Sequence, residues 1–147
     1  MRRVTLLLLL AGCGGGRVDS DGALTSLECV PFARANSGIV LYGDAADWWD
    51  QAAGQYPRGP TPAPGAVLVF ARTGRLPHGH VSVVAHVLGA REITVDHANW
   101  AHGRIGRDEE VWDVSDANDW SAVRVWWSPS ARLGTSTYPV HGFVGPR

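Results

Sequence analysis

The chain contains no lysine, only two cysteines and no long hydrophobic run. Its positive charges are 13 arginines, and 14 acidic residues leave a formal net charge of −1. This balance excludes the strong positive excess that is typical of nucleic-acid-binding proteins. The apolar stretch Val4–Ala11 is too short to span a bilayer, because a transmembrane helix needs about 20 apolar residues.

The short apolar stretch predicts an export signal instead. Two arginines precede it, and the small residues of Leu10-Ala11-Gly12-Cys13 follow it. The last four residues resemble the bacterial lipobox, which implies a signal peptide at residues 1–12, a lipidated Cys13 and a glycine-containing tether at 13–23. We therefore expect an exported protein, anchored through Cys13 to the periplasmic face of the outer membrane. The alternative is an ordinary signal peptide cut at a small residue, which would leave the protein in the periplasm.

The second cysteine has no partner if Cys13 carries lipid. Cys29 is then a free thiol, and a lone thiol in an exported protein is a candidate nucleophile. It lies near the start of a predicted helix, Leu27–Asn36 with Ser26 as N-cap, and a helix N-terminus favours the thiolate. A Cys13–Cys29 disulfide and a buried, inert cysteine remain alternatives.

A histidine at the start of a predicted strand can complete such a site. His80 opens the segment Gly79–Val84, and a nearby imidazole can take the proton of a thiol. One cysteine and one histidine, far apart in the sequence, therefore indicate an acyl-transfer enzyme.

The order of predicted elements indicates an α+β fold with an antiparallel sheet, because helices come first and strands follow. A second helix is expected at Asp44–Gln51, and a proline-rich loop at Pro57–Gly65. The predicted strands are Ala66–Phe70, His80–Val87, Glu92–Val95, Val111–Val114 and Val123–Trp127.

Five segments together resemble the CHAP domain, the cysteine, histidine-dependent amidohydrolase/peptidase family of papain-like peptidoglycan hydrolases. These segments are Glu28–Arg34, Pro64–Phe70, Gly79–Val84, Asp96–Trp100 and Tyr138–Phe143. The resemblance implies one domain over residues 24–147, with N-terminal helices packed on an antiparallel, barrel-like sheet. It also implies that peptidoglycan is the substrate, that an amide or peptide bond is cut, and that no cofactor or metal takes part. The activity would be that of an N-acetylmuramoyl-L-alanine amidase or a peptidoglycan endopeptidase.

The resemblance also assigns roles to residues. Cys29 falls on the nucleophile, with its backbone N–H as an oxyanion donor, and His80 falls on the general base. The position that orients the base falls on His97, where relatives often have an acidic residue or asparagine. In a regular strand His97 and Asn99 share one face, so Asn99 is expected as a second polar contact. Asp96 points to the other face and is the alternative if a bulge changes the register.

Two other functions remain open at this stage. A zinc-dependent hydrolase could draw ligands from Cys29, His78, His80, His97 and His102, although His-x-His alone is a weak signal. A non-catalytic cell-wall-binding module would instead stack sugars on a tryptophan-lined cleft. The tryptophans considered for it are Trp48, Trp49, Trp100, Trp126 and Trp127.

Overall fold

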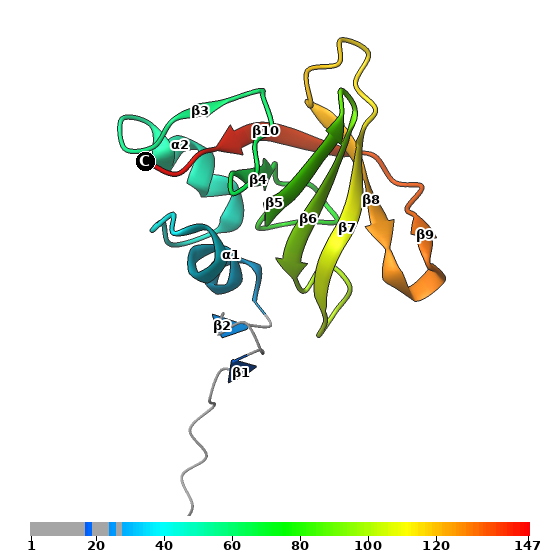
Figure 1. Ribbon diagram of the computed structural model, residues 1–147, viewed down its shortest axis with the longest axis horizontal. Helices are drawn as coiled ribbons and strands as arrows, with labels where there is room; N and C mark the ends of the chain where they lie inside the picture. The colour runs from blue at the N-terminus through cyan, green and yellow to red at the C-terminus, as the bar shows by residue number, and fades with distance from the viewer. Residues whose placement is uncertain (1–16, 19–23, 26–27) are drawn as a thin grey trace, which may run out of the picture.

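The structure of the protein is a computed structural model that describes residues 17–18, 24–25 and 28–147 (Figure 1). The predicted signal peptide, Cys13, Ser26 and most of the predicted tether lie outside the described residues. Two short strands, β1 (Arg17–Val18) and β2 (Leu24–Thr25), pair with each other ahead of the domain. None of the described helices is long and apolar enough to cross a membrane.

Helix α1 (Cys29–Ser37) begins two residues later than predicted, and Glu28 is its N-cap residue. The reason is Pro31, which has no N–H to donate to residue 27, so the first helical bond runs from Phe32 N to Glu28 O at 3.1 Å. At the other end, Gly38 adopts the left-handed conformation (φ 73°), and its N–H bonds to Arg34 O. Cys29 is therefore the first residue of the helix.

The second predicted helix is confirmed near its expected position. It consists of one 3₁₀ turn, η1 (Ala45–Asp47), followed directly by α2 (Trp48–Ala52), with Asp44 as the N-cap residue of η1. Trp48 and Ala52 are fully buried, so α2 packs its apolar side inward. Figure 1 shows α1 and α2 on the same side of the sheet.

The main sheet is antiparallel and closes into a barrel. Its order is β3-β10-β4-β5-β6-β7-β8-β9, and a further pairing of β10 with β8 joins the six central strands into a ring. The structure therefore confirms the α+β class with helices on an antiparallel, barrel-like sheet. The strands are β3 (Arg58–Gly59), β4 (Val67–Phe70), β5 (His80–Gly89), β6 (Glu92–Ala98), β7 (Ile105–Asp113), β8 (Ala122–Trp127), β9 (Arg132–Leu133) and β10 (Tyr138–Val144).

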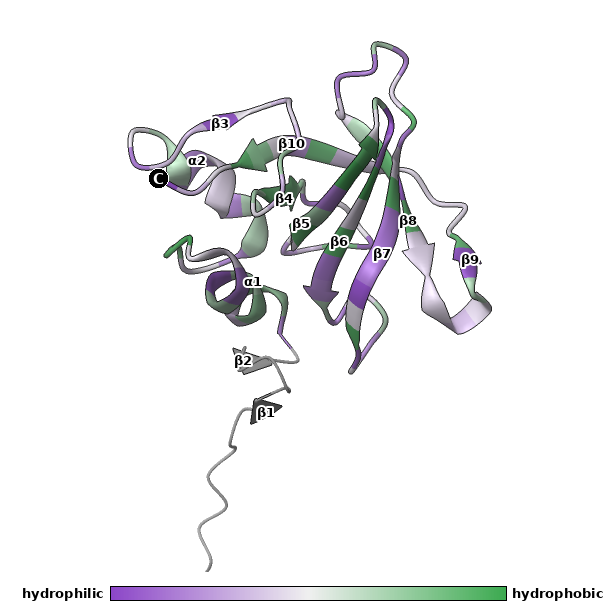
Figure 2. Cartoon of the chain, viewed as in Figure 1, coloured by the Kyte–Doolittle hydropathy of each residue, from purple (hydrophilic) through white to green (hydrophobic). Residues whose placement is uncertain are grey.

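Strand β7 is much longer than the predicted Val111–Val114. It starts at Ile105 and passes through the charged run Arg107–Glu110, which has no apolar alternation from which a strand could be predicted. Figure 2 shows this contrast between a largely hydrophilic β7 and a mostly hydrophobic β5. Strand β10, which closes the barrel, was likewise not among the predicted strands.

Both faces of β4 are buried, which explains its continuous apolar run. Leu68 and Phe70 belong to the core inside the barrel, whereas Val67 and Val69 belong to a second core beneath the helices. The same alternation continues on β5, where Val81 joins the core under the helices. His80, one residue earlier, therefore points to the interior of the barrel.

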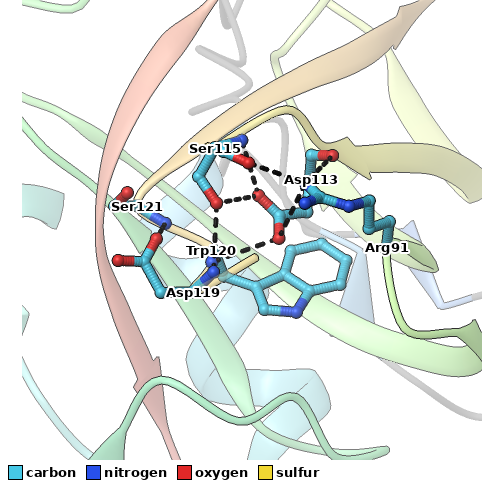
Figure 3. A network of polar contacts seen from close by, with 6 residues as sticks. All are labelled: Arg91, Asp113, Ser115, Asp119, Trp120 and Ser121. Atoms are coloured by element: carbon cyan, nitrogen blue, oxygen red, sulfur yellow. Dashed lines mark hydrogen bonds and ion pairs between the residues drawn. The ribbon is translucent and has the colours of Figure 1, made fainter. Parts of the chain in front are cut away.

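A buried carboxylate stabilises the polar loop 114–121 between β7 and β8 (Figure 3). Asp113 accepts hydrogen bonds from the Ser115 N–H (2.8 Å) and hydroxyl (2.6 Å) and from the Trp120 N–H (3.4 Å). Its side chain is fully buried, and Arg91 lies 3.7 Å away as a counter-charge. This network places the Trp120 side chain in the barrel core.

Candidate active site

Cys29 lies where α1 meets the start of β5. Its side chain is partly buried, and the backbone N–H groups of Val81, Val30 and Cys29 itself lie close enough to the sulfur to lower the pKa of the thiol. Val81 directly follows His80 in β5, so the sulfur lies near the backbone of the residue next to the predicted base. The N–H groups of Cys29 and Val30 are available because the first bond of the helix starts at Phe32.

The pKa of the Cys29 thiol is raised above its usual value of 9.0, contrary to the expectation of a thiolate favoured by the helix start. Burial is the largest cause, and the nearby charge of Glu28 adds to it. The backbone N–H groups act in the opposite direction but are outweighed. Cys29 is therefore a neutral thiol at pH 7.

A pocket of about 310 Å³ opens beside Cys29. Its walls include Glu28, Asp44, His78 and Gly79. Asp44 accepts from both Arg72 Nη2 and His78 Nδ1 at 3.0 Å, which keeps His78 at the rim rather than at the cysteine. Hydrogen bonds to His78 and Arg72 lower the pKa of the Asp44 carboxyl, so it is ionised near neutral pH.

Gly79 allows the chain to enter β5 close to η1. It has φ +72°, and a methyl group in place of its hydrogen would lie 2.6 Å from Ala46 Cβ and 2.7 Å from Phe70 O. A side chain at this position would push the loop away from its neighbours. The glycine before His80 is therefore a geometric requirement for placing the histidine at the strand entrance.

His80 is buried and bonded to a second histidine. Its Nε2 lies 3.1 Å from His97 Nδ1, and its ring makes edge contacts with Phe70 and Trp100 at centroid distances of 5.4 and 5.0 Å. Burial, and then the proximity of His97, place the pKa of His80 well below 6.5. His80 is thus a neutral imidazole at pH 7, and Nδ1 is the ring nitrogen that does not contact His97.

His97 lies on the face of β6 that the strand alternation predicted. It is fully buried, whereas Asp96 points outward to Arg107 Nη1 (3.4 Å) and the Asp108 N–H (2.8 Å). The prediction that His97 and not Asp96 contacts His80 is confirmed. A register shift does occur beside His97, but the extra residue is on β7, so the alternation of β6 is unchanged.

The expectation that Asn99 extends this face is wrong. Strand β6 ends at Ala98, and Asn99 adopts a left-handed conformation (φ 63°). Its side-chain oxygen accepts the Gly103 N–H at 2.8 Å, so Asn99 stabilises the turn that follows the strand. The reason is local: asparagine tolerates positive φ and bonds to nearby backbone, which favours turns.

Three contacts of the histidine pair were not predicted from the sequence. Ser82 Oγ lies 2.9 Å from His97 Nδ1, and Glu109 Oε2 lies 2.9 Å from His97 Nε2. The Trp100 ring stacks on His97 at 5.8 Å and 14°. Ser82 could have been found, because it is two residues from His80 on the same strand face. Glu109 could not, because its position depends on the bulge in β7.

The described residues form neither the grouped zinc ligands nor the single tryptophan cleft that the two alternative functions need. Among the described residues, no three His, Cys, Asp or Glu side chains are grouped so that they could bind a metal. Trp48 is fully buried and Trp49 stacks on His141. Trp100 and Trp127 line a common pocket of about 260 Å³ with Tyr138, so the five tryptophans considered do not form a single cleft.

A thiol at the start of α1 and a buried histidine pair on β5 and β6 define a candidate cysteine–histidine site on this α+β barrel scaffold. The family model of the CHAP domain matches residues 18–99, which is more than half of the chain, and the protein belongs to this family. No curated protein matches the chain. Among solved structures, an N-acetylmuramoyl-L-alanine amidase from Staphylococcus aureus is similar, with 20% identity and a TM-score of 0.49. The similarity covers 86% of this chain but only 34% of the amidase.

Proposed function

We propose that this protein is a peptidoglycan hydrolase that cleaves amide bonds with Cys29 as nucleophile and His80 as general base. The observation that carries the proposal is the placement of Cys29 at the first residue of α1, near the Val81 backbone, together with the His80–His97 pair in a CHAP-family chain. A nucleophile beside a base, which is itself oriented by a third group, is the arrangement that covalent catalysis needs.

Before substrate binds, Cys29 and His80 are both neutral, and this determines the first chemical step. Because burial disfavours both the thiolate and the imidazolium, proton transfer from sulfur to His80 Nδ1 accompanies attack on the substrate carbonyl carbon. The carbonyl electron pair moves to oxygen, where the backbone N–H of Cys29 donates a hydrogen bond. Collapse of this intermediate breaks the C–N bond, and the leaving amine takes the proton from His80.

Water completes the cycle. It attacks the thioester carbon and transfers a proton to His80, and the collapse releases a carboxylic acid while the sulfur regains its proton. In this scheme His97 keeps the His80 ring in place through the 3.1 Å contact, so that Nδ1 remains directed to the chemistry.

The bond that is cut decides between an amidase and an endopeptidase, and digestion of purified muropeptides with mass spectrometry separates the two. An amidase releases an intact stem peptide from the glycan, whereas an endopeptidase shortens the peptide or opens the cross-bridge. Cys29→Ala should remain folded and hydrolyse nothing. Full activity of that variant, or no activity of the wild type on any muropeptide, would reject the proposal.

A matched histidine control tests the zinc alternative at the same time. His102 is exposed on the loop after β6, so His102→Ala should keep wild-type turnover if a cysteine mechanism operates. Chelators should also leave the activity unchanged. Loss of activity with His102→Ala or with chelator would instead favour a metal mechanism.

We also propose that the protein is exported and lipidated on Cys13, on the basis of Leu10-Ala11-Gly12-Cys13 after a charged, apolar leader. Mass spectrometry of protein from native membranes should show two or three acyl chains on Cys13, since a single chain binds only marginally. An unmodified Cys13, or cleavage downstream of it, would contradict this.

A further inference from the structure

Glu109 contacts the histidine pair from the third strand of the site. Its Oε2 lies 2.9 Å from His97 Nε2, and its side chain is only 14% exposed, next to a His97 that is fully buried. The bulge in β7 brings it there: Val95 pairs with Glu109, but His97, two residues later, pairs with Gly106. The extra residue in β7 lies between these pairs, and Asp108 has φ +54°.

Gly106 leaves the space that the Glu109 carboxylate occupies. A methyl group in place of its hydrogen would lie 2.5 Å from Glu109 Cδ and 2.6 Å from Oε2. The backbone conformation at position 106 does not require a glycine, because the φ of Gly106 is not in the left-handed region. The missing side chain is therefore a requirement of the carboxylate position, and not of the turn.

The Glu109 carboxylate dictates which nitrogen of His97 carries the proton. An ionised carboxylate only accepts, so neutral His97 bonded to it has its proton on Nε2 and a lone pair on Nδ1. That lone pair is the acceptor for His80 Nε2–H, and the Ser82 hydroxyl shares the same acceptor. His80 is then protonated on Nε2, and its Nδ1 can accept the proton of Cys29.

The opposite tautomer of His97 would prevent the transfer of the Cys29 proton to His80. With the proton on Nδ1, His97 would donate to His80 Nε2, and His80 would have its own proton on Nδ1. The base would then have no lone pair for the thiol. Ser82 alone does not select between the two states, because a hydroxyl can donate or accept.

We propose that Glu109 is a positioning residue that sets the tautomers of His97 and His80 through one hydrogen bond. The missing side chain at Gly106 leaves the space that the Glu109 carboxylate needs to make this bond. The proposal rests on the proposed function, since it assigns a productive state to the base. It extends the Cys29–His80–His97 set by a carboxylate that acts through His97.

The test combines ¹⁵N NMR of the histidine side chains with muropeptide kinetics, using the full chain. Neutral histidine tautomers have distinct ¹⁵N shifts, so they report the proton positions directly. Glu109→Ala removes the acceptor, and Gly106→Ala displaces it without changing any charge. Glu110→Ala is the matched control, because the neighbouring glutamate bonds to Trp112 Nε1 instead.

Both Glu109→Ala and Gly106→Ala should convert His97 and His80 to mixed tautomers and lower kcat roughly 10- to 100-fold, the range found when a partner that orients a metal-bound histidine is removed. KM should change little. Glu109→Gln retains an acceptor oxygen and should be intermediate, and Glu110→Ala should match the wild type in both measurements.

Unchanged tautomers in Glu109→Ala and Gly106→Ala would overturn the proposal, even if turnover fell, because the loss would then have another cause. If the wild type cleaves no muropeptide, the proposed function fails, and the ¹⁵N spectra alone decide whether Glu109 sets the tautomers.

Discussion

Two buried polar networks lie in the same barrel, and they differ in how many of their polar groups make hydrogen bonds. Around Asp113, three hydrogen bonds and an arginine surround one carboxylate. In the His80–His97 pair, His80 Nδ1 has no hydrogen-bond partner among the described residues, although His97 uses both nitrogens. The hydrogen-bonded Asp113 carboxylate serves the fold, whereas the histidine pair leaves one ring nitrogen, His80 Nδ1, available for chemistry.

The largest effect should come from removing the base. His80→Ala should lower kcat by about 10²- to 10⁴-fold, the usual contribution of a positioned general base. The thermal midpoint should fall less than with a variant of Asp113. A His80→Ala protein that unfolds at room temperature would show that this network is as structural as the other, and the comparison would fail.

Removal of the Asp113 carboxylate should lower the stability of the protein rather than its turnover. Asp113→Ala leaves buried donors from Ser115 and Trp120 without an acceptor, which should cost about 3 kcal/mol of unfolding free energy. Turnover per folded molecule should be unchanged. Asp116→Ala, on the exposed part of the loop 114–121, is the control and should unfold at the wild-type midpoint in thermal denaturation. Equal midpoints for the two variants would contradict the role assigned to Asp113.

His97 and Asp96 are adjacent on β6 but face opposite ways, and this allows a sharper test. His97→Ala should lower turnover about 10- to 100-fold because His80 loses the contact that orients it. Asp96→Asn should cost little, since its partners are Arg107 and the Asp108 backbone. Steady-state kinetics of the two variants would contradict the assignment if Asp96→Asn were the more damaging.

The smallest effect is a pH dependence of stability. Burial lowers the pKa of His80 in the folded protein, so below about pH 6.5 the unfolded chain binds a proton that the folded chain does not. Stability should therefore fall as the pH drops below 6.5, by at most about 1.4 kcal/mol per pH unit for this group.

Denaturant unfolding of the wild type and His80→Ala between pH 7 and 5 measures the difference, and the variant should be less sensitive. The carboxyls whose pKa is lowered contribute stability that is lost only below about pH 3.8, outside this window. They are Asp44, Asp47, Asp108 and Asp119. Equal slopes for the wild type and the variant would reject the assignment to His80.

Local chemistry in the sequence was sufficient to predict the α+β class and much of the histidine site. Period-two alternation correctly placed His97 inside and Asp96 outside, because a bulge on the partner strand does not change the alternation of β6 itself. Alternation failed one residue beyond the strand, where Asn99 begins a turn with positive φ. It also missed the charged half of β7, which forms a strand because its neighbours pair with it.

The sequence by itself determined a helix that starts near Cys29, a glycine that delivers His80 into a strand, and the face on which His97 lies. Only the tertiary structure decided which other residues surround Cys29, His80 and His97. The register of β7 placed Glu109 on His97, and the packing of α1 on β5 buried the thiol and raised its pKa. Strand register and burial depend on residues distant in the chain, and no local pattern contains that information.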